Sequence, residues 1–526
     1  MGLYLSKHEK PIATQRKELR QLVNYRYYQH KHKPKKQRRK LSYSPKAPKI
    51  PKEPRVNPIV AFFKELGECL SNGSLFIKLS TVFMGLGHIY NCQFIKGLLV
   101  FGVQALYIVY MIFGAAPNLA KFSTLGTVKR EAIFDPLTMQ NTVNDYDNSF
   151  TILLGSVCAL FITFLFFLVW ASNIKSMYET QKLIESRKHV NTFREDFKEI
   201  LGNKFHVTLL TFPVIGVILM NIIPILILVA VAFTNYDQNH LPPSELFTWV
   251  GFRNFVKLFT QTTTSSFGYA FRKILEWTFL WAFFATVSNF ILGHLIALLI
   301  NSKIIKIKRF WRTLFIVTIA VPQFVTLLLV RNFFADSGLF NSICSNIGLT
   351  AFLQNIGLVS KNISYIPFLT SPGWAKFMIV LINIWVGIPY QILISTGILL
   401  NIPRDQIEAA MIDRASPYQI FKNVTMPYVM FVEGPTLVTD FVRNINNFNI
   451  IYLLTQDVYV TTDQALANSH GKEVDLLVTW LFRLTNEYYD YKMASVIGVI
   501  VFSICSVFTI LSFSRIVAGE REEVFM

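Results

Sequence analysis

Charged residues are scarce in this chain of 526 residues, and their scarcity argues against a soluble protein. Asp, Glu, Lys and Arg make up 16% of the sequence, whereas soluble domains carry about 25%. Hydrophobic residues reach 52%, and 47 of them are phenylalanines. A chain of this composition is expected to place long apolar segments in a lipid bilayer.

Cysteine pairs and nucleotide-binding motifs are also missing. The five cysteines form no C-x-x-C pair, so neither a disulfide framework nor a metal site is expected. The sequence contains no G-x-x-x-x-G-K-[ST] phosphate loop, so any ATP that drives the protein must bind a separate subunit. No short apolar segment near the start resembles a cleavable signal peptide, and insertion is expected to depend on internal spans.

Long apolar runs are what the chain does have. A membrane-spanning helix needs about 20 mostly apolar residues. Eight segments meet this requirement: 94–114, 150–170, 208–233, 277–300, 313–334, 375–399, 428–455 and 493–515. A further apolar segment, 75–92, is broken by Gly85 and Gly87 and is predicted to be a short interfacial or re-entrant element. The fold class predicted is an all-α polytopic membrane protein with about eight transmembrane helices.

The positive charge gathers at the N-terminus. The net charge is +19, and residues 1–57 hold 17 Lys and Arg against three acidic residues, a local balance of 17 − 3 = +14. The run from Lys33 to Lys40 could bind nucleic acid, but no folded module is there to present it. A cytoplasmic tail that touches anionic lipid is the preferred interpretation, and no nucleic-acid partner is expected.

The loops between spans indicate how the chain is oriented. Loop 171–207 carries seven Lys and Arg, loop 301–312 carries five, and loop 335–373 carries only Lys361. Because basic loops stay on the cytoplasmic side of a membrane, this pattern predicts that both termini are cytoplasmic. The protein is therefore expected to be a multi-pass protein of a bacterial cell membrane.

The loop 401–427, between the sixth and seventh spans, has an internal pattern of its own. Pro403 and Asp405 suit the start of a helix, and Ser416-Pro417 predicts a break after it. A second amphipathic stretch follows the break. A cytoplasmic loop of this kind, with a packed shape and exposed charges, is a plausible docking element for a soluble partner.

This loop resembles the EAA loop of binding-protein-dependent ABC importers. The matching residues stand in register: Glu408, Ala409, Ala410, Asp413, Ala415, Phe421, Val424 and Pro427. One position differs, because Arg414 stands where the family usually has glycine. Glycine often serves a turn with positive φ, so Arg414 predicts either a helical backbone or a different local shape.

The resemblance implies an organisation for the whole chain. It implies a basic cytoplasmic tail at 1–57, an N-terminal membrane region with three spans at 58–274, an ABC type-1 permease core with five spans at 275–516, and a cytoplasmic tail at 517–526. The number of spans resembles the MalF-type branch of sugar permeases. A second, MalG-like permease subunit, two ATPase subunits and an extracellular solute-binding protein would complete the assembly.

The same resemblance implies how the subunits would communicate. The helix of the loop would insert into a cleft on an ATPase subunit, where Glu408 meets a basic residue. ATP and Mg would be bound by that ATPase, so no cofactor is expected in this chain.

Polar residues inside two spans are the candidates for a substrate site. On a helix, Asp440, Arg443, Asn444 and Asn447 of the seventh span share one stripe about 100° wide. Such groups are costly at membrane depth and usually face a cavity or the interior of the helix bundle. In the sixth span, Gly387 is predicted to let a ligand approach the backbone, and Tyr390 offers a ring and a hydroxyl.

These positions correspond, by resemblance, to residues that line the sugar path of MalF-type permeases. Gly387, Tyr390, Asn444 and Asn447 match the residue types of the family, whereas Asp440 and Arg443 do not. The two charged residues either face a ligand or pair with each other inside the bundle.

The function predicted is import of a maltose- or maltodextrin-like oligosaccharide by a transport subunit that is not itself an enzyme. Another sugar, a charged sugar or a glycerol-phosphate-type solute is the first alternative. A polytopic membrane transferase would need a catalytic cluster that the loops do not show. A secondary transporter would predict inverted repeats, which the sequence also does not show.

Overall fold

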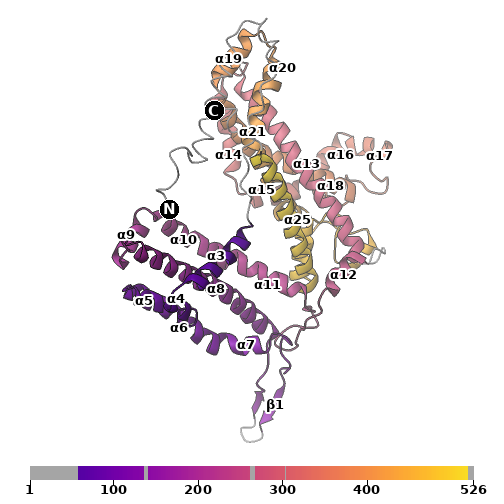
Figure 1. Ribbon diagram of the computed structural model, residues 1–526. Helices are drawn as coiled ribbons and strands as arrows, with labels where there is room; N and C mark the ends of the chain where they lie inside the picture. Colours follow the sequence, from indigo (N-terminus) through magenta and orange to yellow (C-terminus); the bar gives the residue numbers. More distant parts are fainter. Residues whose placement is uncertain (1–56, 136–139, 261–266, 303, 519–526) are drawn as a thin grey trace. The chain divides into compact units, whose positions relative to one another are not determined.

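The described part of the chain folds almost entirely into helices (Figure 1), which confirms the predicted all-α class. The computed structural model describes residues 57–135, 140–260, 267–302 and 304–518. Within these residues the strands form one antiparallel hairpin, β1 (Ala132–Asp135) and β2 (Gln140–Val143). The chain divides into two compact units. The small unit consists of the described residues of 57–102 and 168–193, and the large unit consists of those of 103–167 and 194–518.

The small unit is a set of helices around a short apolar core. Its elements are α3 (Pro58–Asn72), α4 (Leu75–Leu79), α5 (Leu86–Tyr90), the first part of α6 (Phe94–Tyr110) and the second part of α8 (Ser149–Glu185). Cys69, Ile77, Ile174 and Met177 are buried together at its centre. The core therefore joins α3 and α4 to α8.

Two glycines bring α5 against α6 in the small unit. Gly85 precedes α5 with a φ of +91°, which side chains disfavour, and a Cβ there would lie 3.1 Å from the Cα of Gly97. A Cβ on Gly97 would in turn lie 2.6 Å from Ile89. The apolar segment 75–92 is thus two short helices with a turn between them. Its predicted place at the membrane interface stays a prediction.

The large unit contains the remaining elements. Before the loop 401–427 these are η2 (Met111–Ala115), α7 (Ala116–Ala120), α9 (Phe193–Leu201), α10 (Phe205–Val217), η3 (Ile218–Ile222), α11 (Ile223–Ala232), α12 (Arg253–Thr260), α13 (Phe267–Asn301), α14 (Lys308–Ile319), α15 (Gln323–Phe333), α16 (Leu339–Asn346), α17 (Leu349–Asn355) and α18 (Pro372–Leu400). From the loop onward they are α19 (Arg404–Ile412), α20 (Pro417–Ile420), η4 (Phe421–Thr425), α21 (Met426–Ile445), α22 (Phe448–Thr455), α23 (Gln464–Asn468), α24 (Leu477–Asn486) and α25 (Tyr491–Ala518). The η segments are single π-helical turns.

Six helices in the described residues are long and apolar enough to cross a membrane, and a bent pair of helices raises the number to seven. Together, the six helices and the bent pair cover every predicted span except 428–455. That span is present as α21 and α22, but α21 carries three ionisable residues, Glu433, Asp440 and Arg443. Eight spans is therefore an approximate description, because the last of them rests on a polar and interrupted segment.

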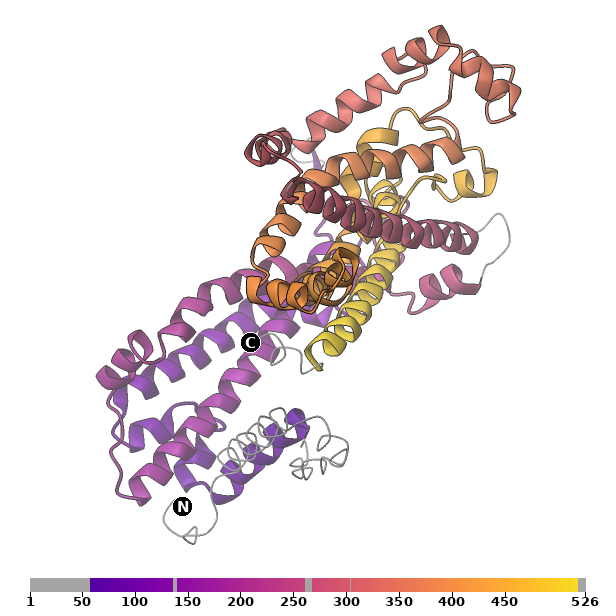
Figure 2. The same ribbon diagram turned by 90° about the horizontal axis from the view of Figure 1, so that it is seen from above.

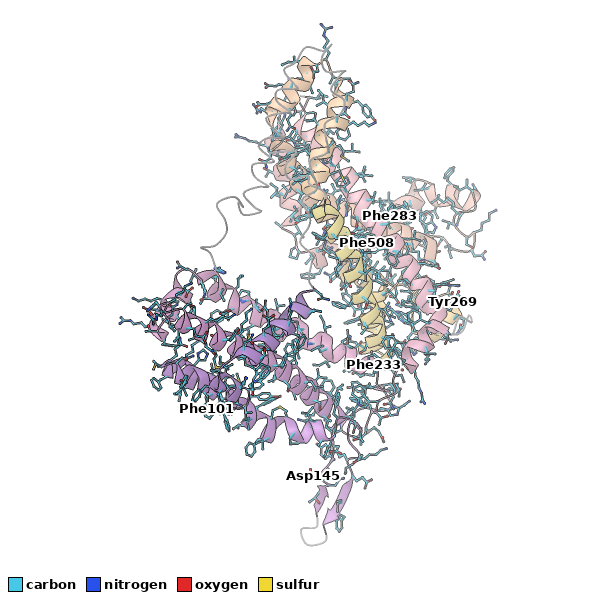
Figure 3. The ribbon with its side chains drawn as sticks, viewed as in Figure 1. Phe101, Asp145, Phe233, Tyr269, Phe283 and Phe508 are labelled. Carbon is cyan, nitrogen blue, oxygen red and sulfur yellow. The ribbon has the colours of Figure 1, made fainter. Side chains whose placement is uncertain are left out.

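The spans expose large apolar side chains on their outer surfaces. Phe101 on α6 and Phe283 on α13, both labelled in Figure 3, are 46% and 53% exposed. Phe212 on α10 is 79% exposed. A soluble protein rarely leaves such contiguous apolar surface open to water, so these faces are suited to contact with lipid.

Helices α13 and α18 make the most extensive helix pair of the large unit, and Figure 2 shows them running side by side. A glycine on each helix faces a carboxamide on the other. Gln391 of α18 packs over Gly293 of α13, and Asn289 of α13 packs over Gly387 of α18. Because neither glycine has a side chain, the two backbones approach closely through this reciprocal contact.

Replacing Gly293 with alanine is expected to loosen this helix pair. The added Cβ would lie 2.5 Å from the Cβ of Gln391, and overpacking of this kind costs about 1–3 kcal/mol. The thermal unfolding midpoint of the detergent-solubilised protein should fall by several degrees. Gly397→Ala on the same helix α18 is the matched control, because its new Cβ has no neighbour within 4 Å. Equal midpoints for both variants would contradict the packing argument.

Candidate functional site

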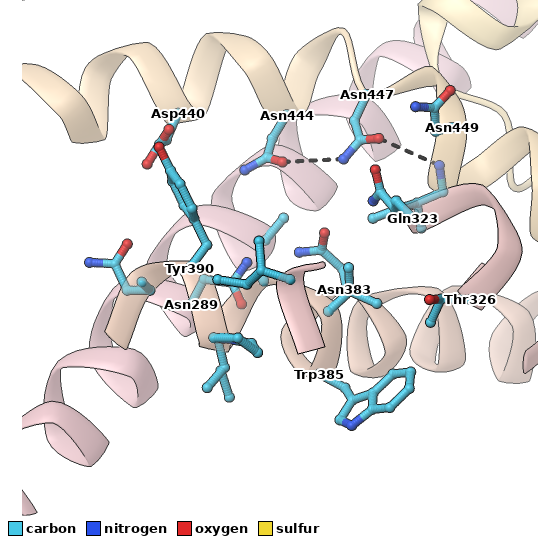
Figure 4. A pocket seen from close by; sticks show the side chains of 18 of the residues that line it. Asn289, Gln323, Thr326, Asn383, Trp385, Tyr390, Asp440, Asn444, Asn447 and Asn449 are labelled. Atoms are coloured by element: carbon cyan, nitrogen blue, oxygen red, sulfur yellow. Dashed lines mark hydrogen bonds between the residues drawn. The ribbon is translucent and has the colours of Figure 1, made fainter. Parts of the chain in front are cut away.

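The large unit contains a partly open cavity of about 790 Å³ between α13, α14, α15, α18 and the α21–α22 segment. All six residues that the sequence singled out in the spans line it: Gly387, Tyr390, Asp440, Arg443, Asn444 and Asn447. Figure 4 shows Asp440, Asn444 and Asn447 in a row along one side, with Tyr390 reaching toward Asp440. The structure thus brings residues of two separate spans to one site.

Asp440 and Arg443 pair with each other at the cavity. Nη2 of Arg443 lies 3.0 Å from Oδ1 of Asp440, one helical turn away on α21. The Asp440 side chain is 16% exposed and that of Arg443 is 61% exposed. The guanidinium also lies 6.0 Å from the centroid of the Tyr390 ring, at the limit of a cation–π contact. Both predicted roles are therefore compatible, because the pair satisfies itself and still borders the cavity.

The two asparagines reach the cavity in different ways. Asn444 is buried near the end of α21 and donates to Oγ1 of Thr286 on α13 at 3.0 Å. Asn447 lies beyond the helix, where its side chain accepts from the backbone N–H of Ile450 and caps α22. The prediction that Asn447 continues a helical stripe is wrong, because the helix ends at Ile445.

Gly387 lines the cavity and also has a packing role that the sequence did not predict. A Cβ at this position would overlap the side chain of Asn289, whose Oδ1 would lie 2.9 Å away. The position that a Cβ would take at Gly387 is therefore filled by Asn289, while the approach of a ligand to this backbone stays a prediction. Glycine is needed here so that Asn289 can present its carboxamide at the edge of the cavity.

A sharp bend in the predicted fifth span, 313–334, supplies further polar groups. Helices α14 and α15 meet at 88° around Pro322, and Thr318, Gln323 and Thr326 beside this bend line the cavity. Non-helical backbone at membrane depth is tolerated where it lines a cavity or is buried in protein. Pro322 was the one sign of this bend in the sequence.

Sequence reasoning did not single out most of the carboxamides at the cavity. They come from α13, α15, α18 and the start of α22: Asn289, Gln323, Asn383, Gln391, Asn446 and Asn449. The signal was present, because each is a polar residue inside or beside a predicted span. The aromatic residues Phe315, Trp385 and Phe448 also line the cavity.

Two of the carboxamides have buried atoms without a hydrogen-bond partner among the described residues. They are Oδ1 of Asn289 and Nδ2 of Asn383. Leaving such a group unpaired costs about 1–3 kcal/mol, so a polar partner would stabilise both atoms. A wall of carboxamides and aromatic rings can bind a ligand with many hydroxyls and apolar faces.

A buried hydrogen bond connects a residue of the cavity wall to Glu433, within the first half of α21. Nε2 of Gln391, which lines the cavity, donates to Oε1 of Glu433 on α21 and also lies 3.2 Å from Oγ of Ser395. Glu433 is 1% exposed. This contact ties α18 to α21, the two helices that the loop 401–427 connects.

The loop itself has the predicted helix–break–helix form. Helix α19 follows Pro403, and α20 begins at Pro417 after a reciprocal cap in which Ser416 and Gln419 each bond the other's backbone N–H. The hydroxyl of Tyr428 donates to the carbonyl of Asn401 at 3.2 Å and joins the two ends of the loop. Figure 1 shows α19 and α20 together beyond the ends of α18 and α21.

The residues of the predicted docking motif lie on this loop with different exposure. Glu408 and Ala409 of α19, Asp413 and Pro427 are exposed, whereas Ala410, Ala415 and Phe421 are half-buried. Three large apolar residues that sequence reasoning did not single out are also exposed there: Met411 at 57%, Ile412 at 81% and Tyr418 at 69%. The tip of the loop thus combines an acidic side chain with apolar surface.

Arg414 adopts the backbone conformation that glycine favours. Its φ is +57°, in the left-handed region. The N–H of Arg414 bonds the carbonyl of Met411, and the N–H of Ala415 bonds the carbonyl of Ala410, both at 3.0 Å. This pair of bonds is the Schellman ending of a helix. The alternatives predicted for Arg414, a helical backbone or a different local shape, are therefore wrong: the left-handed turn remains, and an arginine occupies it.

Comparison with known proteins identifies a family model and several relatives that match this chain. The family model for "Binding-protein-dependent transport system inner membrane component" matches residues 289–518. This region overlaps the core predicted at 275–516, whose boundaries stay a prediction.

Individual relatives extend the similarity over most of the chain. The maltodextrin transport system permease protein MalC of Streptococcus pneumoniae is 32% identical over 85% of this chain and 97% of its own length. The galactooligosaccharides transport system permease protein GanP of Bacillus subtilis is 32% identical over 80% of this chain and 93% of its own. The maltose/maltodextrin transport system permease protein MalF of Escherichia coli is 27% identical over 53% of this chain and 51% of its own.

Substitutions at Arg414 should rank by how well each residue tolerates positive φ. Arg414→Gly should leave the thermal unfolding midpoint of the solubilised protein within about a degree, whereas Arg414→Val should lower it, because a β-branched residue is an outlier there. Backbone strain of this kind costs about 1–3 kcal/mol. If valine and glycine at 414 gave the same midpoint, the strained turn would not contribute to stability.

Proposed function

This chain belongs to the family of binding-protein-dependent transport system inner membrane components, and we propose that its cargo is a neutral oligosaccharide of the maltodextrin type. The chain is a multi-pass permease subunit of an ABC importer in a bacterial membrane, a transport subunit rather than an enzyme. The wall of carboxamides and aromatic rings around the cavity is the observation that carries the proposal. Sugar hydroxyls both donate and accept hydrogen bonds, as carboxamides do.

The charge of the cavity favours a neutral sugar over a glycerol-phosphate-type solute. Among the described residues that line it, Asp440 and Arg443 are the only charged ones, and they pair at 3.0 Å. A phosphate would need a cation that is not already neutralised. Maltodextrin and galacto-oligosaccharide permeases are equally similar to this chain at 32% identity, so galacto-oligosaccharides are the alternative cargo.

The decisive experiment is ATP hydrolysis by the reconstituted transporter across a panel of ligands. Maltodextrins, presented with the binding protein, should stimulate hydrolysis more than galacto-oligosaccharides, and glycerol phosphate should not stimulate it. Stimulation by glycerol phosphate alone would overturn the neutral-sugar proposal.

The exposed loop supports a proposed assembly with a second permease subunit, two ATPase subunits and an extracellular solute-binding protein. On this proposal α19 docks into an ATPase subunit through Glu408, with Met411 and Ile412 as apolar contacts. In the proposed orientation both termini are cytoplasmic, and this loop lies on the same side as the ATPase subunits.

Removing the Tyr390 ring is the cleanest test of the proposed sugar site. Tyr390 is 49% exposed at the cavity, whereas Asn444 also holds Thr286 and is a poorer probe. Loss of an aromatic contact worth about 0.5–1.5 kcal/mol should raise the maltodextrin concentration for half-maximal uptake by about threefold to tenfold in Tyr390→Ala.

The matched control is Phe377→Ala on the same helix. Phe377 is 59% exposed but does not line the cavity, so its loss should leave the half-maximal concentration unchanged. Tyr390→Phe separates the contribution of the hydroxyl from that of the ring. An unchanged value in Tyr390→Ala would refute the role of this residue.

Glu408→Lys should separate ATP hydrolysis from transport. The substitution places like charges together at the proposed docking contact, which costs several kcal/mol, while the exposed site leaves membrane insertion intact. Uptake should fall more than tenfold, with a smaller loss of basal hydrolysis. Glu65→Lys on α3 is the control charge reversal, because it breaks an exposed ion pair with Lys175 that is of little energetic value. Normal uptake in Glu408→Lys would contradict the proposed docking contact of Glu408 with an ATPase subunit.

A further inference from the structure

The side chain of Gln391 lines the sugar cavity, and neighbouring helices hold most of it in place. Its stem packs over Gly293 of α13, where a Cβ would lie 2.5 Å from the Cβ of Gln391. Its Nε2 donates to Oε1 of Glu433 on α21 and lies 3.2 Å from Oγ of Ser395, one turn further along α18. Gln391 is only 5% exposed. Packing and hydrogen bonds therefore fix one orientation of this side chain.

One polar atom of Gln391 remains for a ligand. A carboxamide has two donors on its nitrogen and one acceptor oxygen. The nitrogen faces Glu433 and Ser395, whereas Oε1 accepts from no described residue. This oxygen is not one of the enclosed polar atoms without a partner, so it is open to the cavity that Gln391 lines. The cavity wall therefore presents a hydrogen-bond acceptor at this point.

Glu433 determines which end of the carboxamide faces the cavity. A glutamine amide can turn by about 180° with little change in shape, so its orientation depends on the groups around it. The hydroxyl of Ser395 both donates and accepts, and it would pair with either end. Glu433 is 1% exposed, and its Oε1 accepts from Nε2 of Gln391. Turning the amide would place two acceptor oxygens together in a buried contact, which is unfavourable.

We propose that Glu433 is a positioning residue for the sugar site, an inference that rests on the proposed function. Glu433 is not among the described residues that line the cavity, so it acts through Gln391. By holding Nε2, it presents Oε1 of Gln391 as the acceptor for one hydroxyl of the sugar. The site then selects a sugar whose hydroxyl at this point can donate a hydrogen bond.

Uptake of deoxyfluoro sugars tests whether the wall accepts from a hydroxyl. Fluorine is close to a hydroxyl in size but cannot donate a hydrogen bond. The reconstituted transporter would take up maltotriose and a set of its monodeoxyfluoro analogues, each lacking one hydroxyl. The same binding protein would deliver them to every variant, so a change in the uptake ratio between variants comes from the permease. Wild type should prefer maltotriose over at least one analogue by about threefold to tenfold.

Glu433→Met should lose most of this preference. It removes the acceptor of Nε2, so Ser395 can donate to Oε1 while Nε2 of Gln391 turns to the cavity. The maximal rate with maltotriose should fall by a smaller factor than the preference. Glu433→Gln should keep the preference, since its own Oε1 can accept from Gln391. Gln391→Leu should lose the preference, and Glu433→Met added to it should change nothing further, because Glu433 acts through Gln391.

Tyr428→Phe is the matched control. It removes the hydrogen bond between Tyr428 of α21 and Asn401 at the end of α18, and neither residue lines the cavity, so this variant should keep the preference. Assembly of each variant, checked by size-exclusion chromatography, separates a changed site from a misfolded protein.

Three results would overturn the positioning role of Glu433: no preference in wild type against any analogue, an unchanged preference in Glu433→Met, or a further loss when Glu433→Met is added to Gln391→Leu. An equal loss in Glu433→Gln and Glu433→Met would also overturn it, because glutamine retains the acceptor. A wild-type transporter that takes up no maltotriose would instead overturn the proposed function.

Discussion

The close contact between α13 and α18 determines both the packing of the large unit and the chemistry of its cavity. Gly293 and Gly387 leave room for Gln391 and Asn289, so two carboxamides stand where apolar side chains would otherwise separate the helices. Asn289 and Gln391 both border the cavity. A bilayer supplies no hydrophobic force between helices, and small residues with polar partners are a common solution. The polar wall of the cavity is thus a direct result of how the two helices pack.

Hydrogen bonds also link α18, one helix of this contact, to α21, which follows the exposed loop 401–427. Gln391 donates to the buried Glu433 of α21, and Tyr428 of α21 donates to Asn401 at the end of α18. The two helices that enter and leave the loop are therefore joined at two levels. On the proposed function, a partner that moves α19 cannot shift one helix without the other. On the same proposal, this linkage is a physical route from ATP hydrolysis in a partner subunit to the cavity.

The sequence predicts continuous features well and interruptions poorly. Apolar length located the spans, and Ser416-Pro417 located the break in the loop, because both depend on local chain properties. The 88° bend at Pro322 and the end of α21 at Ile445 interrupt segments that apolar length alone predicts as continuous helices. A stripe calculated from a continuous helix therefore placed Asn444 correctly on α21 but misplaced Asn447. The role of Gly387 depends on Asn289, which is 98 residues away in the sequence and adjacent only after folding.

Arg414 shows that a left-handed turn can form without the glycine that the family usually has at this position. The Schellman bonds from Arg414 and Ala415 hold the turn after α19 whatever the side chain is. An arginine at this position bears the strain of positive φ, but it also places a cation at the C-terminus of a helix, where the helix dipole favours it by about 0.3–1 kcal/mol. The two effects oppose each other, so the missing glycine need not destabilise the loop. The departure changes the charge of the exposed tip beside Ile412 while the path of the backbone is retained.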